Sequence, residues 1–240
     1  MELKDMIARR RSVRAYEDRR VDKETLDELL DFIGGVKRLD ASIRAEVRLV
    51  ERSQVTTMQS WATPHFLQVS SEEKGDWLEN AGFMMQQVDL YLQSKGLGSC
   101  WVGLGLPETG IVPEGMKHVI LMPFGYPKNV PERSDVSEFR RKELHEISDV
   151  EDARLEAVRI APSACNGQPW YFVHEGEKLH LFRDHLGLVK RPALTKMNRI
   201  DAGIALAHLY VTNPDGFCFF KAEKKPEHRG LIYVGTVKLA

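Results

Sequence analysis

The sequence predicts an α+β fold in which two similar halves each combine a sheet with packed helices. The first observation is that β-branched and aromatic stretches occur in runs between helices, without the regular alternation of a doubly wound sheet. The second is a faint repetition, because each half offers a helix, a strand, a long amphipathic helix and another strand. We therefore expect two half-domains, 1–150 and 151–240, with antiparallel or mixed sheets related by a pseudo-two-fold axis.

Helices are expected where apolar residues recur at helical spacing. The expected helices cover residues 21–35, 72–95, 152–161 and 198–211. Asp22 can cap the first helix, Gly96 ends the second, and Pro162 ends the third because proline disfavours helical geometry in the preceding residue. On the first helix, Leu30 is expected on the apolar face. His208, on the apolar face of the last helix, is expected to be a core histidine with its hydrogen bonds satisfied.

Strands are expected where β-branched and aromatic residues gather between turn residues. The expected strands cover residues 45–50, 65–69, 119–124, 170–174, 178–183, 217–222 and 231–237. Glu175, Gly176 and Glu177 would join the fourth and fifth of these strands as a hairpin.

The composition gives no sign of a strongly charged partner. The chain of 240 residues has 34 basic and 35 acidic side chains, so its charge does not call for nucleic acid or an anionic membrane. With no membrane-spanning run or signal-like start, a cytoplasmic location is expected. The three cysteines and eight histidines are scattered, so we expect no metal site and treat Cys100, Cys165 and Cys218 as small apolar residues.

Chemistry is first suggested near the N-terminus by Arg9-Arg10-Arg11-Ser12-Val13-Arg14. Guanidinium groups beside a hydroxyl suit a phosphate ester, and a cation can also hydrogen-bond the pyrimidine edge of a flavin. The alternative is a solvated basic helix end or an interaction patch.

The second candidate is the loop Ala161-Pro162-Ser163-Ala164-Cys165-Asn166-Gly167-Gln168-Pro169-Trp170. Ser163 and Asn166 can bond ribityl hydroxyls, Gln168 can reach a backbone or ribityl group, and two prolines hold the loop in one shape. The alternative is a plain turn before a core tryptophan, Trp170.

Together, RRSVR and APSxxNxQPW resemble the two signature segments of the nitroreductase family of FMN enzymes. The resemblance implies that the first segment grips the flavin phosphate and pyrimidine edge, and that the second contacts the ribityl chain. It also implies that the turn at 96–103 places backbone amides near flavin N5, and that Arg133, Arg140 or Arg141 binds phosphate. The implied cofactor-binding residues are Arg10, Arg11, Ser12, Arg14, Val102, Gly103, Arg140, Arg141, Pro162, Ser163, Ala164, Asn166 and Gln168.

The spacing departs from the usual family pattern, in which the second segment soon follows the first. Here about 150 residues separate them and each occurs once. The chain is therefore similar to a subgroup in which two nitroreductase-like halves share one chain and mimic the usual dimer. This subgroup implies one surviving flavin site, built from both halves, so a monomer could hold a single FMN.

The resemblance implies an FMN-dependent oxidoreductase in which NADH or NADPH and then a nitroaromatic, quinone or enone react in a ping-pong cycle. Arg14 would stabilise the reduced flavin near N1 and O2, and no other catalytic residue is assigned. Two alternatives stay open. One is an FMN-binding module for flavin storage, sensing or breakdown without reductase activity. The other is a basic-helix protein whose arginines contact phosphate backbones.

Overall fold

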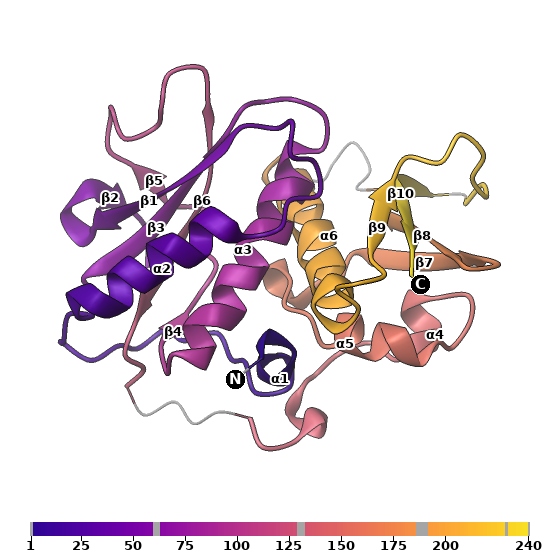
Figure 1. The fold of residues 1–240 in the computed structure, drawn as a ribbon, viewed down its shortest axis with the longest axis horizontal. Coiled ribbons are helices and arrows are strands. Elements are labelled where there is room, and N and C mark those ends of the chain that lie inside the picture. Colours follow the sequence, from indigo (N-terminus) through magenta and orange to yellow (C-terminus); the bar gives the residue numbers. More distant parts are fainter. Residues whose placement is uncertain (1, 60–62, 129–132, 186–191, 229, 240) are drawn as a thin grey trace.

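Two sheets lie on either side of a central helix pair in the computed structural model, which describes residues 2–59, 63–128, 133–185, 192–228 and 230–239 (Figure 1). The central helices are α3 (Trp77–Ser94) and α6 (Pro192–Thr212). Each sheet has four strands, and every strand pair in both sheets is antiparallel. The expected α+β class is therefore confirmed.

The first sheet comes entirely from the N-terminal half, in the order β1-β3-β6-β4. Its strands are β1 (Ala45–Glu51), β3 (His65–Ser71), β6 (Lys117–Gly125) and β4 (Gly98–Ser99). The three strands predicted in this half are thus found, longer by one, two and three residues in chain order. A separate pair joins β2 (Val55–Thr56) to β5 (Leu106–Pro107). Every residue of β3 is buried, because this strand lies at the centre of the sheet.

The second sheet comes entirely from the C-terminal half, in the order β7-β8-β10-β9. Its strands are β7 (Trp170–Glu175), β8 (Lys178–Asp184), β10 (Leu231–Lys238) and β9 (Cys218–Phe220). The predicted hairpin is confirmed, since β7 and β8 pair across a turn in which Gly176 has φ +59°. Glycine adopts this left-handed conformation without the steric cost that a Cβ brings.

Most predicted helices are present with shifted ends. Helix α2 (Lys23–Gly35) is capped by Asp22, whose side chain accepts the Thr25 N–H. The helix predicted from 72 begins at 77, because β3 runs to Ser71 and residue 75 is a glycine with φ +54°. The helix predicted from 198 begins six residues earlier, as α6. Leu30 was wrongly assigned to the apolar face of α2, since 41% of it is exposed.

The remaining helices are short. The segment predicted as one helix over 152–161 divides into a 3₁₀ turn, η3 (Ala153–Leu155), and α5 (Glu156–Arg159). The others are α1 (Leu3–Ile7), η1 (Arg52–Gln54), η2 (Val136–Glu138), α4 (Leu144–Ile147) and η4 (Ala164–Asn166). No helix in the described ranges is both long and apolar enough to cross a membrane.

One continuous core joins the two halves through α3 and α6. The helix axes can approach closely at two glycines: a Cβ on Gly82 would lie 2.1 Å from the Ile200 carbonyl oxygen, and one on Gly203 would lie 2.0 Å from the Glu79 carbonyl oxygen. Each sheet therefore belongs to one half of the chain, whereas the hydrophobic core is shared by both halves. The division at residue 150 and the pseudo-two-fold axis stay predictions.

Several side-chain assignments can be compared with the fold. His208 is fully buried and its Nδ1 lies 2.7 Å from the Ala157 carbonyl oxygen, but its Nε2 has no hydrogen-bond partner among the described residues, so it is only half satisfied. Cys100 is buried as expected. Cys165 and Cys218 are exposed, so they do not contribute to the core as small apolar residues.

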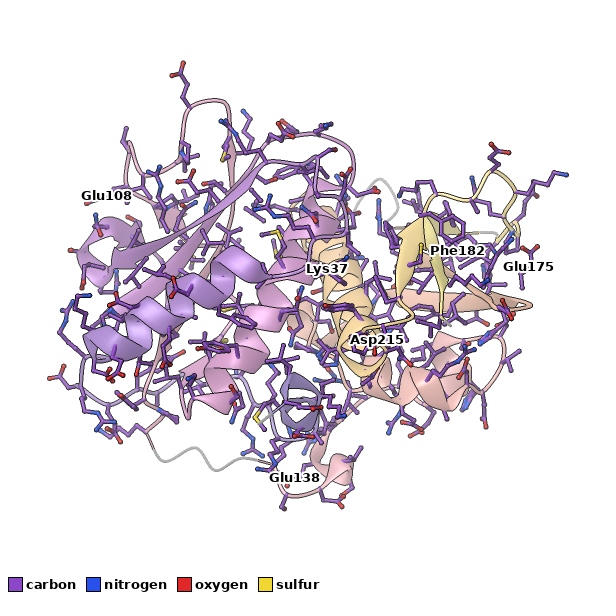
Figure 2. The ribbon with its side chains drawn as sticks, viewed as in Figure 1. Lys37, Glu108, Glu138, Glu175, Phe182 and Asp215 are labelled. Carbon is purple, nitrogen blue, oxygen red and sulfur yellow. The ribbon has the colours of Figure 1, made fainter. Side chains whose placement is uncertain are left out.

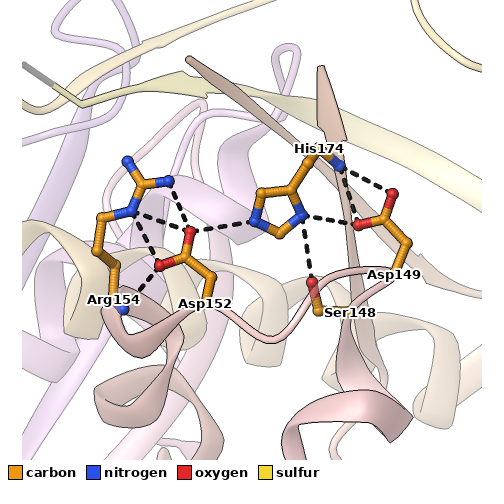
Figure 3. Close-up of polar contacts among 5 residues, drawn as sticks. All are labelled: Ser148, Asp149, Asp152, Arg154 and His174. Atoms are coloured by element: carbon orange, nitrogen blue, oxygen red, sulfur yellow. Dashed lines mark hydrogen bonds and ion pairs between the residues drawn. The ribbon is translucent and has the colours of Figure 1, made fainter. Parts of the chain in front are cut away.

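A polar cluster ties the connection between the halves to β7 (Figure 3). The ring of His174 lies between two carboxylates, with Nδ1 2.7 Å from Asp149 and Nε2 3.1 Å from Asp152. Arg154 forms a further ion pair with Asp152. The Ser148 hydroxyl oxygen lies 3.4 Å from His174 Nδ1, the same nitrogen that Asp149 contacts. Ser148, His174 and Asp149 therefore do not form a nucleophile–base–acid relay.

Candidate functional site

The two motif segments meet at one cavity of about 420 Å³. It lies where the N-terminal segment, the turn after α3, the loop before β7 and α6 come together. Six of the predicted site residues line it: Ser12, Arg14, Gly103, Pro162, Ser163 and Ala164. A stretch near residue 12 and another near residue 163 are therefore brought to the same walls although they are about 150 residues apart in the chain.

The N-terminal segment is held at the cavity by the edge of the first sheet. Val13 N–H donates to the Ser99 carbonyl at 2.9 Å, and Ser12 forms a parallel bridge with Ser99. A Cβ on Gly98 would lie 2.3 Å from the Val13 side chain, so only glycine permits this approach. The Tyr16 hydroxyl donates to the Val13 carbonyl at 2.7 Å. These contacts fix Ser12 and Arg14 at the cavity.

Arg10 does not line the cavity but lies behind it. The guanidinium is buried, forms an ion pair with Asp89 of α3, and donates to Ser12 Oγ at 3.0 Å. Asp89 also accepts a hydrogen bond from the Ser99 hydroxyl. Arg10 therefore positions Ser12 and completes a buried charge pair. Its neighbour Arg11 instead pairs with Glu138 at the surface, 2.7 Å away.

The charges of Arg10, Arg133 and Arg141 influence one another, and Arg141 also contacts the loop that precedes β7. Burial and then the positive charge of Arg10 lower the pKa of Arg133 to about 10, and the same two causes, joined by Arg133, lower the pKa of Arg141 to about 10. The Nε of Arg133 is buried without a hydrogen-bond partner in the described part of the chain. Partly buried cations that repel one another favour an anionic group between them.

The loop itself is anchored from several sides. Ser163 Oγ accepts the Gln168 N–H at 2.9 Å. Asn166 donates to the Arg140 carbonyl at 2.8 Å and accepts from Arg141, while buried Gln168 accepts the Lys142 N–H at 2.8 Å. Asn166 and Gln168 are thus engaged by the basic segment at 140–142, and neither lines the cavity. Of the two candidate arginines there, Arg141 is the one that bonds the loop through its guanidinium.

Three non-glycine residues of this loop have left-handed backbones. The φ angles are +53° at Cys165, +56° at Asn166 and +47° at Gln168. Each such conformation costs about 1–3 kcal/mol and persists where the surroundings impose it, often at ligand-binding sites. The anchoring contacts of the loop supply those surroundings.

The turn after α3 contributes a backbone wall. Gly103 lines the cavity, and a Cβ there would lie 2.8 Å from the sulfur of Met197. Val102 is buried and its N–H donates to the Leu121 carbonyl at 2.9 Å, so this amide is occupied by the sheet. Burial raises the pKa of the Cys100 thiol, which also lines the cavity, so the thiol stays protonated at neutral pH.

The rest of the wall comes mainly from α6 and from apolar side chains. The additional lining residues are Cys100, Trp101, Leu104, Ile120, Cys165, Leu194, Met197, Ile200, Asp201 and Ile204. Asp201 is the acidic member of this set, and both of its oxygens lie 3.1 Å from the Ala164 N–H. The sequence could have indicated Asp201 only because it is a carboxylate among Ile200, Gly203 and Ile204, on a helix face with the apolar spacing of a core.

Comparisons with known proteins agree with this arrangement. A family model described as "Putative TM nitroreductase" matches residues 2–213. A curated protein of Methanothermobacter thermautotrophicus, named "Putative NADH dehydrogenase/NAD(P)H nitroreductase", is 27% identical over 158 residues, which are 57% of this chain and 83% of that protein.

Solved structures share the fold. A nitroreductase from Thermotoga maritima, itself described as putative, superposes with a TM-score of 0.68 at 21% identity and covers 100% of this chain and 93% of its own. A nitroreductase family protein from Clostridium difficile 630 gives a TM-score of 0.51 at 21% identity, over 64% of this chain and 99% of its own. At this identity the similarity concerns the fold.

Proposed function

The chain belongs to the family described as Putative TM nitroreductase, and we propose that it is an oxidoreductase that binds one FMN in the cavity between its halves and takes electrons from NADH or NADPH. The observation that carries the proposal is the meeting of Ser12 and Arg14 with Pro162 and Ser163 on the walls of one cavity. The name of the curated relative, an NAD(P)H nitroreductase, supports the choice of electron donor.

The residues present fit an FMN. The phosphate would lie among Arg10, Arg133 and Arg141. There the buried Nε of Arg133 has no hydrogen-bond partner among the described residues, and burial and neighbouring positive charges lower the pKa values of Arg133 and Arg141, which favours an anion. The ring would occupy the cavity beside Ser12 and Arg14. Bound FMN supplies two-electron redox chemistry, and the chain supplies orientation and charge. Arg14 would place a positive charge where negative charge develops.

The apolar wall favours an uncharged, flat second substrate. Ile120, Ile200, Ile204, Leu104 and Met197 line the cavity and offer no partner for a charged group. Small nitroaromatics, quinones or enones have this character. We propose that such a compound follows the nicotinamide into the same space in a ping-pong cycle.

The same observations bear on the alternatives. A basic-helix protein that contacts phosphate backbones would need its arginines on one exposed face, whereas Arg10 is buried with Asp89 and Arg11 pairs with Glu138. An FMN module without reductase activity would share the cavity, so only reduction by NAD(P)H separates it from the leading proposal.

The two half-domains predict the ratio of flavin to protein. Residues 1–150 would supply the arginine grip and residues 151–240 the APSxxNxQPW loop, so a monomer would be complete with one FMN. Light scattering of the purified protein, combined with flavin released on denaturation, measures this ratio. Two flavins per chain, or a flavin-bound form found only as a dimer, would contradict it.

The test of the function starts with the absorption spectrum of the purified protein and its anaerobic titration with NADH and NADPH. We expect flavin bands that bleach on titration. Arg14→Ala should weaken FMN binding at least tenfold, because a charge-assisted hydrogen bond is worth about 1.5–3 kcal/mol. Arg20→Ala, which removes an exposed charge paired with Glu51, is the matched control and should leave the binding unchanged. Protein that binds FMN but does not bleach would support the storage, sensing or breakdown alternative.

A further inference from the structure

The acidic group on the cavity wall has an unusual environment. Asp201 is 3% exposed, and both carboxyl oxygens accept from one donor, the Ala164 N–H. No cation or hydroxyl of the described residues lies within hydrogen-bond distance of the carboxyl. A buried carboxylate with one neutral partner is unfavourable, since most of its hydration is lost without replacement. This loss of hydration favours the protonated, uncharged form of the carboxyl group.

The other half of the chain has a counterpart that cannot ionise. Asn80 precedes Gly82 by two residues on α3, as Asp201 precedes Gly203 on α6. The Asn80 side-chain oxygen accepts the N–H of Leu39 at 2.9 Å and that of Asp40 at 3.3 Å. Both side chains thus hold a loop by its backbone, and an amide suffices for that task. The acid lies in the half whose loop lines the cavity.

Other ionisable groups near Asp201 do not neutralise a carboxylate. Arg14, Cys100 and Cys165 share the cavity wall. On α6 itself, Arg199 pairs with Glu79 of α3 at 2.7 Å, and Lys196 donates to the His118 carbonyl. Burial raises the pKa of Asp201 to about 8, against a smaller opposing effect of the Ala164 hydrogen bond. At neutral pH the group is mainly a carboxylic acid.

From this geometry we propose that Asp201 holds a proton at the cavity wall and donates it in a hydrogen bond to an acceptor atom of the flavin ring, while its other oxygen accepts the Ala164 N–H. The inference rests on the proposed binding of FMN. Asp201 would then select an uncharged ring with hydrogen-bond acceptors on its edge. Deprotonation would remove the donor and place a negative charge against the ring, so flavin binding would weaken as the pH rises through about 8.

The first experiment measures the proton itself, on protein freed of flavin. At about pH 6.5 ordinary Asp and Glu side chains are ionised, so the infrared C=O band of a carboxylic acid reports only groups with a raised pKa. We expect this band in the wild type and in the control Asp215→Asn, which removes an exposed carboxylate from the turn after α6 (Figure 2). Asp201→Asn should lack it. A wild type without the band, or a band that survives in Asp201→Asn, would overturn the proposal.

The second experiment measures riboflavin binding by fluorescence at about pH 6.5 and about pH 9. Riboflavin has no phosphate, so phosphate titration does not contribute. If only the protonated form binds, the wild-type affinity should fall about tenfold at one pH unit above the pKa, whereas Asp201→Asn should show no such fall. Equal pH profiles in the two proteins would refute the role of Asp201. Absence of flavin binding at any pH would instead refute the proposed function, and the infrared result would still decide whether the proton is present.

Discussion

Gly82 of α3 and Gly203 of α6 pack reciprocally, each against the carbonyl group three residues before the other. An added Cβ would lie 2.1 Å from the Ile200 oxygen in one case and 2.0 Å from the Glu79 oxygen in the other. This crossing lies in the core shared by both halves. The equivalence of the two glycines, and of Asn80 and Asp201 beside them, supports the proposed internal duplication.

The close crossing predicts a large cost for a single methyl group. Gly203→Ala should lower the free energy of unfolding by about 1–3 kcal/mol, because the backbone of α3 cannot yield as a flexible side chain could. Gly34→Ala is the control, since a Cβ there meets nothing within 4 Å and alanine favours the helix by about 1 kcal/mol. Denaturant unfolding compares the two variants. Equal stability would mean that the helices separate readily.

Local patterns were sufficient to predict most of the fold. The seven longer strands and α2 follow from residue spacing and from caps such as Asp22, which lie close together in sequence, whereas the two-residue strands β2, β4 and β5 were not predicted. The start of α3 was harder to predict, because the left-handed backbone at Gly75 separates the end of β3 from the helix. The exposure of Leu30, Cys165 and Cys218 could not be predicted, since it depends on which surfaces the other half covers.

The site could be predicted only in part. Two segments were identified by resemblance, and both reach the cavity. The sequence could not tell which arginine is buried, because the partner of Arg10 is Asp89, 79 positions away. Asp201 was missed for a similar reason. It lies within a helix face that has the spacing of a core, and nothing local indicates that this face borders a cavity.

Neighbouring arginines should differ sharply in their effect on stability. Arg10→Ala leaves the Asp89 carboxylate buried without its cation, so it should cost about 3–5 kcal/mol. Arg11→Ala breaks a surface pair with Glu138 and should cost about 0–1 kcal/mol. Figure 2 shows Glu138 on the outer side of the molecule. Thermal and denaturant unfolding measure both values, and similar losses would contradict the buried charge pair.

The contribution of the polar cluster around His174 to stability should be lost in acid. The Arg154 guanidinium, followed by a backbone N–H and His174, lowers the pKa of Asp152 to about 2 against the desolvation of the group. A lowered folded-state pKa gives stability that is present above the unfolded value of 3.8 and lost as the pH falls through about 2. Asp152→Asn should therefore cost about 1–2 kcal/mol at about pH 7. The cost should nearly vanish at about pH 2.

Glu151→Gln, at an exposed neighbouring position, is the control for this polar cluster. It should change the free energy of unfolding little at either pH. If Asp152→Asn lowered the free energy of unfolding equally in acid and at neutral pH, the polar cluster would stabilise the fold through packing and not through charge.

The opposite pH dependence is expected at Asp201. Its folded-state pKa is raised from 3.8 to about 8, so the folded protein keeps a proton that the unfolded chain has lost across this range. The wild type should therefore lose stability as the pH rises from about 4 to about 8, relative to a variant that cannot ionise. Asp201→Asn should match the wild type near pH 4 and exceed its free energy of unfolding by on the order of 3 kcal/mol near pH 8. Urea unfolding across this range is the measurement, with Asp215→Asn as the control without a pH-dependent difference. A constant offset between Asp201→Asn and the wild type would mean that the carboxylate is accommodated without cost, and that Asp201 ionises normally in the folded protein.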